Sequence, residues 1–119
     1  MIGETRTWKS SNELQARYWS TTYPTDALVE MMRLVDYVRG NLPLEIPQDV
    51  LVFFSPADTV VNPDRIVEAY GQINSPHKQL IPVPASADPS NHVITGNIMS
   101  PANTLPVTED IVKFVRSNS

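Results

Sequence analysis

The segment from Val50 to Phe54 has the sequence VLVFF and contains no polar residue. A strand with one face in water alternates apolar and polar side chains, whereas a strand covered on both faces does not. Coverage on both faces is typical of parallel sheets, because their crossover helices pack on either side. We therefore predict that Val50–Phe54 is a strand of a parallel sheet and that the chain is an α/β protein.

The residues after this strand predict a βαβ unit. Asn62 is suited to the N-cap of a helix and Pro63 to its first position, and apolar residues at helical spacing continue to about Asn74. A second strand is expected at about Gln79–Val83. It should lie at the edge of the sheet, because Pro82 has no N–H to donate. The crossover between the two strands should be right-handed.

Three further helices are expected, at about Asn12–Trp19, about Pro24–Arg39 and about Pro106–Arg116. Apolar residues in the second recur at the spacing of one helical face, which we interpret as facing the core. An adaptable, methionine-containing binding groove is the less economical interpretation of that face. Gly40 is expected to take the left-handed conformation that ends this helix. Residues 84–105 are expected to form a long loop.

Composition excludes several classes of protein. The chain has no cysteine, which excludes disulfides, thiolate zinc sites and cysteine nucleophiles. A formal charge of −4 argues against nucleic-acid binding, and no apolar run approaches the ~20 residues that span a membrane. No glycine-rich phosphate-binding motif occurs, and we expect no cofactor. Residues 1–10 are polar and show no signal peptide, so we expect a cytoplasmic protein.

Two residues that could carry chemistry follow the predicted strands. Asp58 lies just after the first strand, and His92 lies in the loop after the second. Because the carboxyl ends of parallel strands meet at one rim of a sheet, we expect the two residues to lie close together. The aspartate would fix the tautomer of the histidine and leave its other ring nitrogen as a general base. The alternatives are that Asp58 caps a turn and that His92 is simply solvated.

A metal site is a weaker interpretation of the same region. Asp64, Asp88 and His92 carry side chains that bind metals, but their spacing is not diagnostic of any metal motif. His77 lies apart from them, between Pro76 and Lys78. We therefore expect no metal.

The sequence around Asp58 and His92 resembles the C-terminal part of an α/β-hydrolase of the bacterial esterase and lipase type. The similarity rests on SPADTVV at residues 55–61 and DPSNHV at residues 88–93, and it extends from about Pro24 to Arg116. In that family the chain order of the triad is Ser, Asp, His, which Asp58 and His92 respect. The resemblance implies that Asp58 is the triad acid and His92 the triad base.

The resemblance also implies a division of the chain. Residues 24–119 would be the C-terminal part of the hydrolase domain, and residues 1–23 would resemble the end of the family's cap insertion. Four aromatic residues in the cap-like segment would then either line an acyl site or simply pack on the domain. They are Trp8, Tyr18, Trp19 and Tyr23.

The chain departs from the family at the nucleophile. It contains no G-x-S-x-G pentapeptide and no HG or HGG oxyanion-hole segment. The serines nearest to the pair in sequence lie on no strand-to-helix elbow flanked by glycines. These are Ser55, Ser86, Ser90 and Ser100. Since a triad without its nucleophile retains little activity, we expect no appreciable esterase activity from this chain alone.

The leading expectation is therefore a partial α/β-hydrolase fold that holds two triad members of a carboxylic-ester hydrolase. Its substrate, if the site is completed, would be a small ester or acyl compound. A fully apolar strand with few neighbours should pair with another chain, either a second copy or a polypeptide that supplies the missing strands and serine. Two alternatives stay open. One is a non-catalytic binding or assembly module on the same scaffold, and the other is an unrelated α/β domain in which Asp58 and His92 lie far apart.

Overall fold

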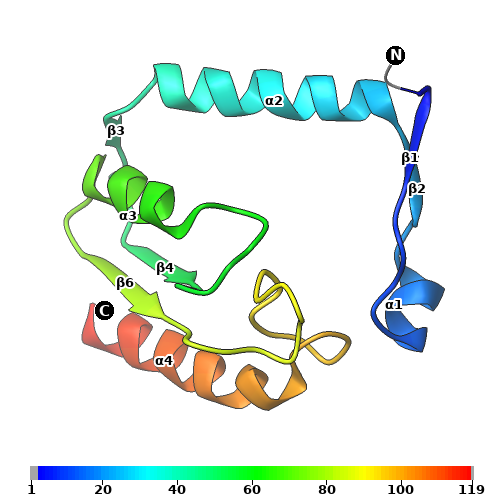
Figure 1. Ribbon diagram of the computed structural model, residues 1–119. Helices are drawn as coiled ribbons and strands as arrows, with labels where there is room; N and C mark the ends of the chain where they lie inside the picture. Colours follow the sequence, from blue (N-terminus) through cyan, green and yellow to red (C-terminus); the bar gives the residue numbers. More distant parts are fainter. Residues whose placement is uncertain (1–2, 119) are drawn as a thin grey trace. The chain divides into compact units, whose positions relative to one another are not determined.

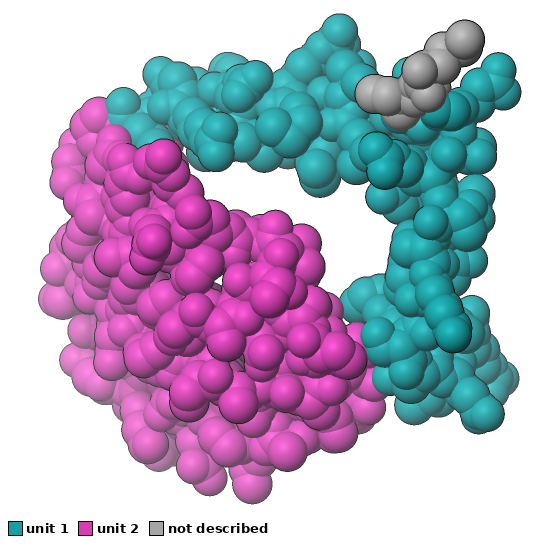
Figure 2. Space-filling view, viewed as in Figure 1, with its two compact units in different colours: residues 1–42 teal, residues 43–119 magenta. Residues whose placement is uncertain are grey.

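A computed structural model describes residues 3–118, which form a mixed α/β structure of four α-helices and three two-stranded sheets (Figure 1). The chain divides into two compact units, residues 1–42 and 43–119 (Figure 2). The boundary between the two units lies after the second helix. The division between residues 23 and 24, which was expected from the sequence, is a different one and depends only on the resemblance to a cap insertion. None of the helices in the described range is long and apolar enough to cross a membrane.

The first unit joins an antiparallel strand pair to two helices. Strand β1 (Thr5–Thr7) pairs with β2 (Thr22–Pro24). Neither strand was predicted, because three residues are too few to show a periodicity. Helix α1 (Glu13–Tyr18) begins where Asn12 accepts a hydrogen bond from the backbone N–H of Gln15, at 2.8 Å. Both predicted helices of this unit are confirmed to within one or two residues, since the second is α2 (Thr25–Gly40).

The expected left-handed cap at Gly40 is wrong. Gly40 is the last helical residue of α2, and the C-cap is Asn41 with φ of −103°. The side-chain amide of Asn41 donates to the carbonyl oxygen of Tyr37, at 2.7 Å, and so satisfies one of the free carbonyls at the end of the helix. No glycine in a left-handed conformation is then needed.

The apolar face of α2 does not face a core, contrary to the prediction. No residue of this helix is buried. On the face that the spacing predicts, Met31, Leu34 and Val38 are exposed. Leu28 and Val35 on the same face are only half-buried. The other elements of the first unit are short, and they offer too little apolar surface to cover a helix of 16 residues.

The second unit is built on the predicted βαβ unit. Strand β4 (Val50–Phe54) pairs in parallel with β6 (Lys78–Pro82), and helix α3 (Pro63–Gly71) connects them and packs on β4. The predicted strands and the cap of α3 are confirmed. The helix is shorter than expected because Ile73–Asn74 forms β5, which pairs in parallel with β3 (Leu44–Glu45).

Strand β4 is less covered than its sequence predicts. All five of its residues are half-buried, and among residues 3–118 it has a hydrogen-bonded neighbour on one side only. Two strands and one helix cannot cover both faces of a strand and both of its edges. The buried apolar side chains of the second unit are few, namely Val83, Met99 and Val107.

Hydrogen bonds connect the long loop after β6 to the beginning of the last helix, α4 (Thr104–Ser117). This helix begins two residues earlier than expected. The side-chain amide of Asn103 donates to the carbonyl oxygens of Ala85 and Ile94, at 2.8 and 3.0 Å. The hydroxyl of Thr104 accepts from the N–H of Gly96, at 3.1 Å. These bonds close the loop at both of its ends, so His92 lies in an ordered segment.

Candidate active site

Asp58 and His92 are in contact. The Nδ1 atom of His92 lies 2.9 Å from Oδ2 of Asp58. Asp58 closes the turn that ends β4, where its N–H donates to the carbonyl oxygen of Ser55 at 3.2 Å. His92 belongs to the loop after β6, so the two residues meet at the carboxyl ends of two paired parallel strands. This contact excludes the interpretation in which they lie far apart.

The two carboxylate oxygens of Asp58 have different partners. Oδ1 accepts hydrogen bonds from the backbone N–H groups of Val60 and Val61, at 2.7 and 2.9 Å. Oδ2 is left for the imidazole of His92. Asp58 therefore caps its own turn through Oδ1 and holds His92 through Oδ2. The capping role and the pairing role, which the sequence left as alternatives, are both present in one side chain.

The charge state of Asp58 determines the tautomer of His92. Burial alone would raise the pKa of Asp58, whose side chain is 6% exposed, but the hydrogen bonds from Val61, His92 and Val60 outweigh it and lower the pKa below its usual value of 3.8. An ionised carboxylate can only accept, so Nδ1 of neutral His92 must carry the proton. The Nε2 atom then holds a lone pair. The imidazole is 42% exposed, and no hydrogen bond to Nε2 is formed within residues 3–118.

A second connection fixes the distance between the two loops. The backbone N–H of Thr59 donates to the carbonyl oxygen of Ser90 at 3.0 Å, and the Thr59 hydroxyl donates to the same oxygen at 3.2 Å. Thr59 follows Asp58 directly, and Ser90 lies two residues before His92. The backbone thus holds the acid and the base together independently of their side chains.

None of the four serines nearest to the pair in sequence is placed as a nucleophile. Ser55 and Ser100 are each only 1% exposed, and the Ser100 hydroxyl donates to the carbonyl oxygen of Val93. The Ser90 hydroxyl donates to Asp88 at 2.7 Å, and the Ser86 hydroxyl lies 3.5 Å from the Asp88 carbonyl oxygen. None of the four is hydrogen-bonded to His92 within the described residues.

The residues considered as metal ligands do not form a metal site. The Asp88 carboxylate is surrounded by N–H and O–H donors, which is the opposite of what a cation requires. Asp64 lies in the first turn of α3. In the part of the chain that the structure describes, no three histidine, aspartate or glutamate side chains gather closely enough to hold a metal ion.

Comparison with known proteins assigns no role to Asp58 and His92. No family model, no curated protein and no solved structure matches the chain. The interpretation of Asp58 and His92 therefore depends on their contact and charge state, together with the resemblance of the segments 55–61 and 88–93.

A second aspartate–histidine pair, which was not predicted from the sequence, lies in the same unit. The Nδ1 atom of His77 lies 2.9 Å from Oδ1 of Asp49. Asp49 directly precedes β4 and His77 directly precedes β6, so this pair joins the opposite ends of the same two strands. The parallel register was the signal that could have revealed it. With the same two residue types and the same distance, the second pair is a natural control for the first.

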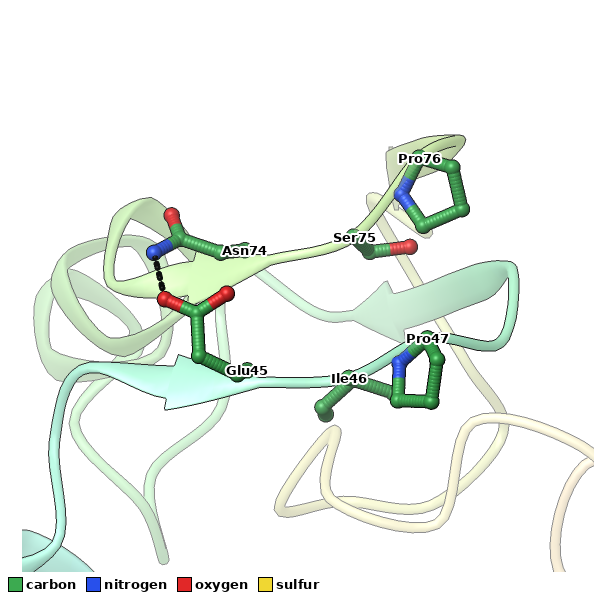
Figure 3. Close-up of a pocket in the computed structure, with 6 residues that line it drawn as sticks. All are labelled: Glu45, Ile46, Pro47, Asn74, Ser75 and Pro76. Atoms are coloured by element: carbon green, nitrogen blue, oxygen red, sulfur yellow. Dashed lines mark hydrogen bonds between the residues drawn. The ribbon is translucent and has the colours of Figure 1, made fainter.

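A surface depression of about 370 Å³ lies elsewhere in the second unit, where β3 and β5 end (Figure 3). Two of its lining residues, Glu45 and Asn74, point toward one another, with Oε1 of Glu45 accepting from the Asn74 amide at 2.6 Å. Its other lining residues are Ile46, Pro47, Ser75 and Pro76. Neither Asp58 nor His92 lines this depression, so it is not a substrate pocket for the pair.

Proposed function

We propose that this chain is the C-terminal part of a serine hydrolase that acts on carboxylic esters, with Asp58 as the triad acid and His92 as the general base. One observation carries the proposal. A shielded, ionised aspartate holds Nδ1 of a histidine whose imidazole is 42% exposed and whose Nε2 has no hydrogen-bond partner among residues 3–118. The partial α/β-hydrolase fold and the cap-like role of residues 1–23 are part of the same proposal.

The chemistry of the proposed site follows from this arrangement. Nε2 of His92 would take the proton of a serine hydroxyl as the serine oxygen forms a bond to the ester carbonyl carbon. The same proton would then pass to the alkoxide as the bond between carbonyl carbon and alkoxide breaks, leaving an acyl-serine for water to hydrolyse. Asp58 stays ionised and stabilises the imidazolium that forms in between. The sequence contains no serine in the setting that this step requires, so the nucleophile comes from residues outside residues 1–119.

A second candidate function is a non-catalytic binding or assembly module on the same scaffold. The observation that favours it is the absence of a serine beside Nε2 of His92 in the described residues, combined with a depression that the pair does not line. Under this alternative the pair would only tie the two loops together. The geometry of the pair would then be the same, but no ester chemistry would depend on it.

The tautomer of His92 tests the geometric basis of the proposal. In the full chain labelled with ¹⁵N at histidine, we expect neutral His92 to be protonated mainly at Nδ1, as donation to Asp58 requires. Asp58→Asn should reverse this preference, because an amide can donate to Nδ1. His77→Gln assigns the second histidine. Predominant protonation of His92 at Nε2 in the unsubstituted chain would contradict the proposal.

Activity separates the two candidate functions. We expect the chain alone to hydrolyse a short-chain nitrophenyl ester no faster than its His92→Ala variant. The full chain would next be joined behind the nucleophile-bearing part of a serine esterase that lacks its own acid and histidine. In a folded chimera, His92→Ala should lower turnover by about 10⁴-fold or more, whereas His77→Ala should leave it unchanged. A folded chimera without ester hydrolysis would favour the binding module.

A further inference from the structure

We propose that Asp88 is the positioning residue for His92: its carboxylate holds the backbone of residues 90–93 in the one conformation that places the imidazole against Asp58. The catalytic meaning of this role rests on the proposed function, whereas the positional role does not. Neither the composition of the loop nor the resemblance to hydrolases assigns Asp88 such a role.

The contacts of the Asp88 carboxylate carry the inference. Asp88 is 4% exposed. Its Oδ1 atom accepts from the N–H of Ser90 at 3.1 Å, and its Oδ2 atom accepts from the Ser90 hydroxyl at 2.7 Å. Oδ2 also accepts from the N–H groups of His92 and Val93, at 3.1 and 2.8 Å. The peptide groups on both sides of the His92 Cα atom are thus bound to one carboxylate oxygen.

The turn inside this loop depends on the same residue. Asn91 has φ of 52°, a left-handed conformation that is costly for residues other than glycine and is tolerated best by asparagine and aspartate. Its N–H donates to the Asp88 carbonyl oxygen at 2.9 Å, and its side-chain oxygen accepts from the N–H of Ser86 at 2.9 Å. This reversal at Asn91 is what brings the N–H groups of residues 90, 92 and 93 around a single carboxylate.

The same contacts connect Asp88 to the acid of the pair. Ser90 gives its N–H and its hydroxyl to Asp88, and its carbonyl oxygen accepts from both donors of Thr59, the residue after Asp58. Asp88 therefore fixes Ser90 relative to the Asp58 turn and fixes His92 relative to Ser90. It has no hydrogen bond to the imidazole itself, so it acts on the pair only through the backbone.

The four donors around the buried Asp88 carboxylate favour its ionised form. Burial alone would raise the pKa of Asp88, but the hydrogen bonds from Val93, Ser90 and His92 outweigh it and lower the pKa below 3.8. An ionised acceptor can bind all four donors at once, whereas an amide offers a single acceptor atom and directs its own N–H groups at the rest. Asp88→Asn therefore changes the loop conformation with almost no change in side-chain volume.

The test is the tautomer of His92 in the full chain carrying Asp88→Asn. We expect the ratio of Nδ1-protonated to Nε2-protonated His92 to fall roughly tenfold, as the loss of one charge-assisted hydrogen bond produces. His77 should keep its tautomer, because its contact with Asp49 lies at the other ends of the strands. Ser90→Ala removes only one donor and should shift His92 in the same direction by less.

Each outcome has a defined meaning. A shift at His92 alone supports the positioning role. An unchanged His92 in folded Asp88→Asn overturns it, and so does an equal shift of both histidines, because that would report general loosening of the second unit. If Asp88→Asn does not fold, an unchanged His92 in Ser90→Ala overturns it instead. Failure of the proposed function alone is a separate result, namely a folded chimera that hydrolyses no ester although His92 of the unsubstituted chain is protonated at Nδ1.

Discussion

Among residues 3–118, Asn91 is the one residue other than glycine that has a positive φ, and the cost of this conformation is measurable. Asn91→Ala places a Cβ-bearing residue with no compensating side chain at φ of 52° and leaves the N–H of Ser86 without its partner. We expect a loss of about 1–3 kcal/mol in the free energy of unfolding. Asn91→Gly removes the same hydrogen bond but relieves the backbone, so its loss should be smaller.

Urea denaturation followed by circular dichroism compares these two variants with the unsubstituted chain. Equal losses for Asn91→Ala and Asn91→Gly would show that the backbone conformation costs nothing at this position. Side-chain volume has little effect on the difference between the two variants, because alanine and glycine differ by one methyl group.

The two shielded carboxyls predict how stability depends on pH. Asp58 and Asp88 both have a pKa below 3.8 in the folded chain, so the unfolded chain binds more protons once the pH approaches that value. Stability from these groups is therefore fully present above the unfolded pKa and is lost as the pH falls through the folded pKa. The slope is about 1.4 kcal/mol per pH unit for each additional proton.

Unfolding free energies measured from pH 6 down to acid should show this loss. Asp88→Asn should be less stable at pH 6 but should lose less on acidification, because one of the two groups no longer titrates. A variant with the same acid dependence as the unsubstituted chain would contradict the lowered pKa of Asp88.

Single residues differ in how far the sequence could predict their roles. The contact between Asp58 and His92 follows from two strands and the rule that parallel strands end at one rim. The role of Asp88 does not follow from any periodicity, because it depends on the left-handed turn at Asn91, which the local sequence permits but does not require. The contact between Asp49 and His77 was predictable in principle, once the register of β4 and β6 was known.

At the scale of elements, caps and apolar runs predicted the structure where they were strong. The strand β4, the strand β6 and the beginning of α3 were all predicted correctly. The pairs β1–β2 and β3–β5 were missed, because strands of two or three residues are too short to show a period. The expectation for Gly40 failed because a neighbouring asparagine side chain supplies the donor that ends α2.

The cap of α3 gives a prediction at the same scale. The Asn62 side chain accepts from the N–H of Asp64 at 2.9 Å. Asn62→Ala should lower the free energy of unfolding by about 1 kcal/mol, whereas Asn62→Ser should keep most of the stability, because serine caps helices about as well. Thermal and urea unfolding of the two variants check this order. Equal stability of Asn62→Ala and Asn62→Ser would contradict a capping role.

At the scale of the whole molecule, the apolar surface that this chain leaves uncovered is the main feature that its sequence could not explain alone. The residues of β4 are as apolar as those of a strand inside a large parallel sheet, yet they are only half-buried. The apolar run of β4 predicts a strand that is stable when it is covered on both faces. It does not indicate whether the covering elements belong to the same chain. This is why the strand was predicted correctly and its burial was not.

The free edge of β4 follows from the alternation of a parallel ladder. The N–H of Val50 and the carbonyl oxygen of Phe54 bond toward β6, at 2.9 and 2.8 Å. Because alternate residues of a parallel strand bond to opposite neighbours, Val52 also bonds toward β6. Leu51 and Phe53 then direct their backbone groups to the side of β4 on which no strand of the described chain lies.

We expect this edge to mediate self-association, with β4 pairing antiparallel to its copy across a two-fold axis. Leu51→Pro removes an N–H from the free edge and should shift the chain toward monomer while leaving β4 paired with β6, because proline is tolerated at strand edges. Val52→Pro is the matched control, since it removes an N–H from the β4–β6 ladder and should lower stability instead.

Sedimentation over a range of concentrations measures the association, and urea unfolding measures the stability. A chain that is monomeric at every concentration contradicts the prediction, and association that persists in folded Leu51→Pro would assign it to another surface, such as the exposed apolar face of α2.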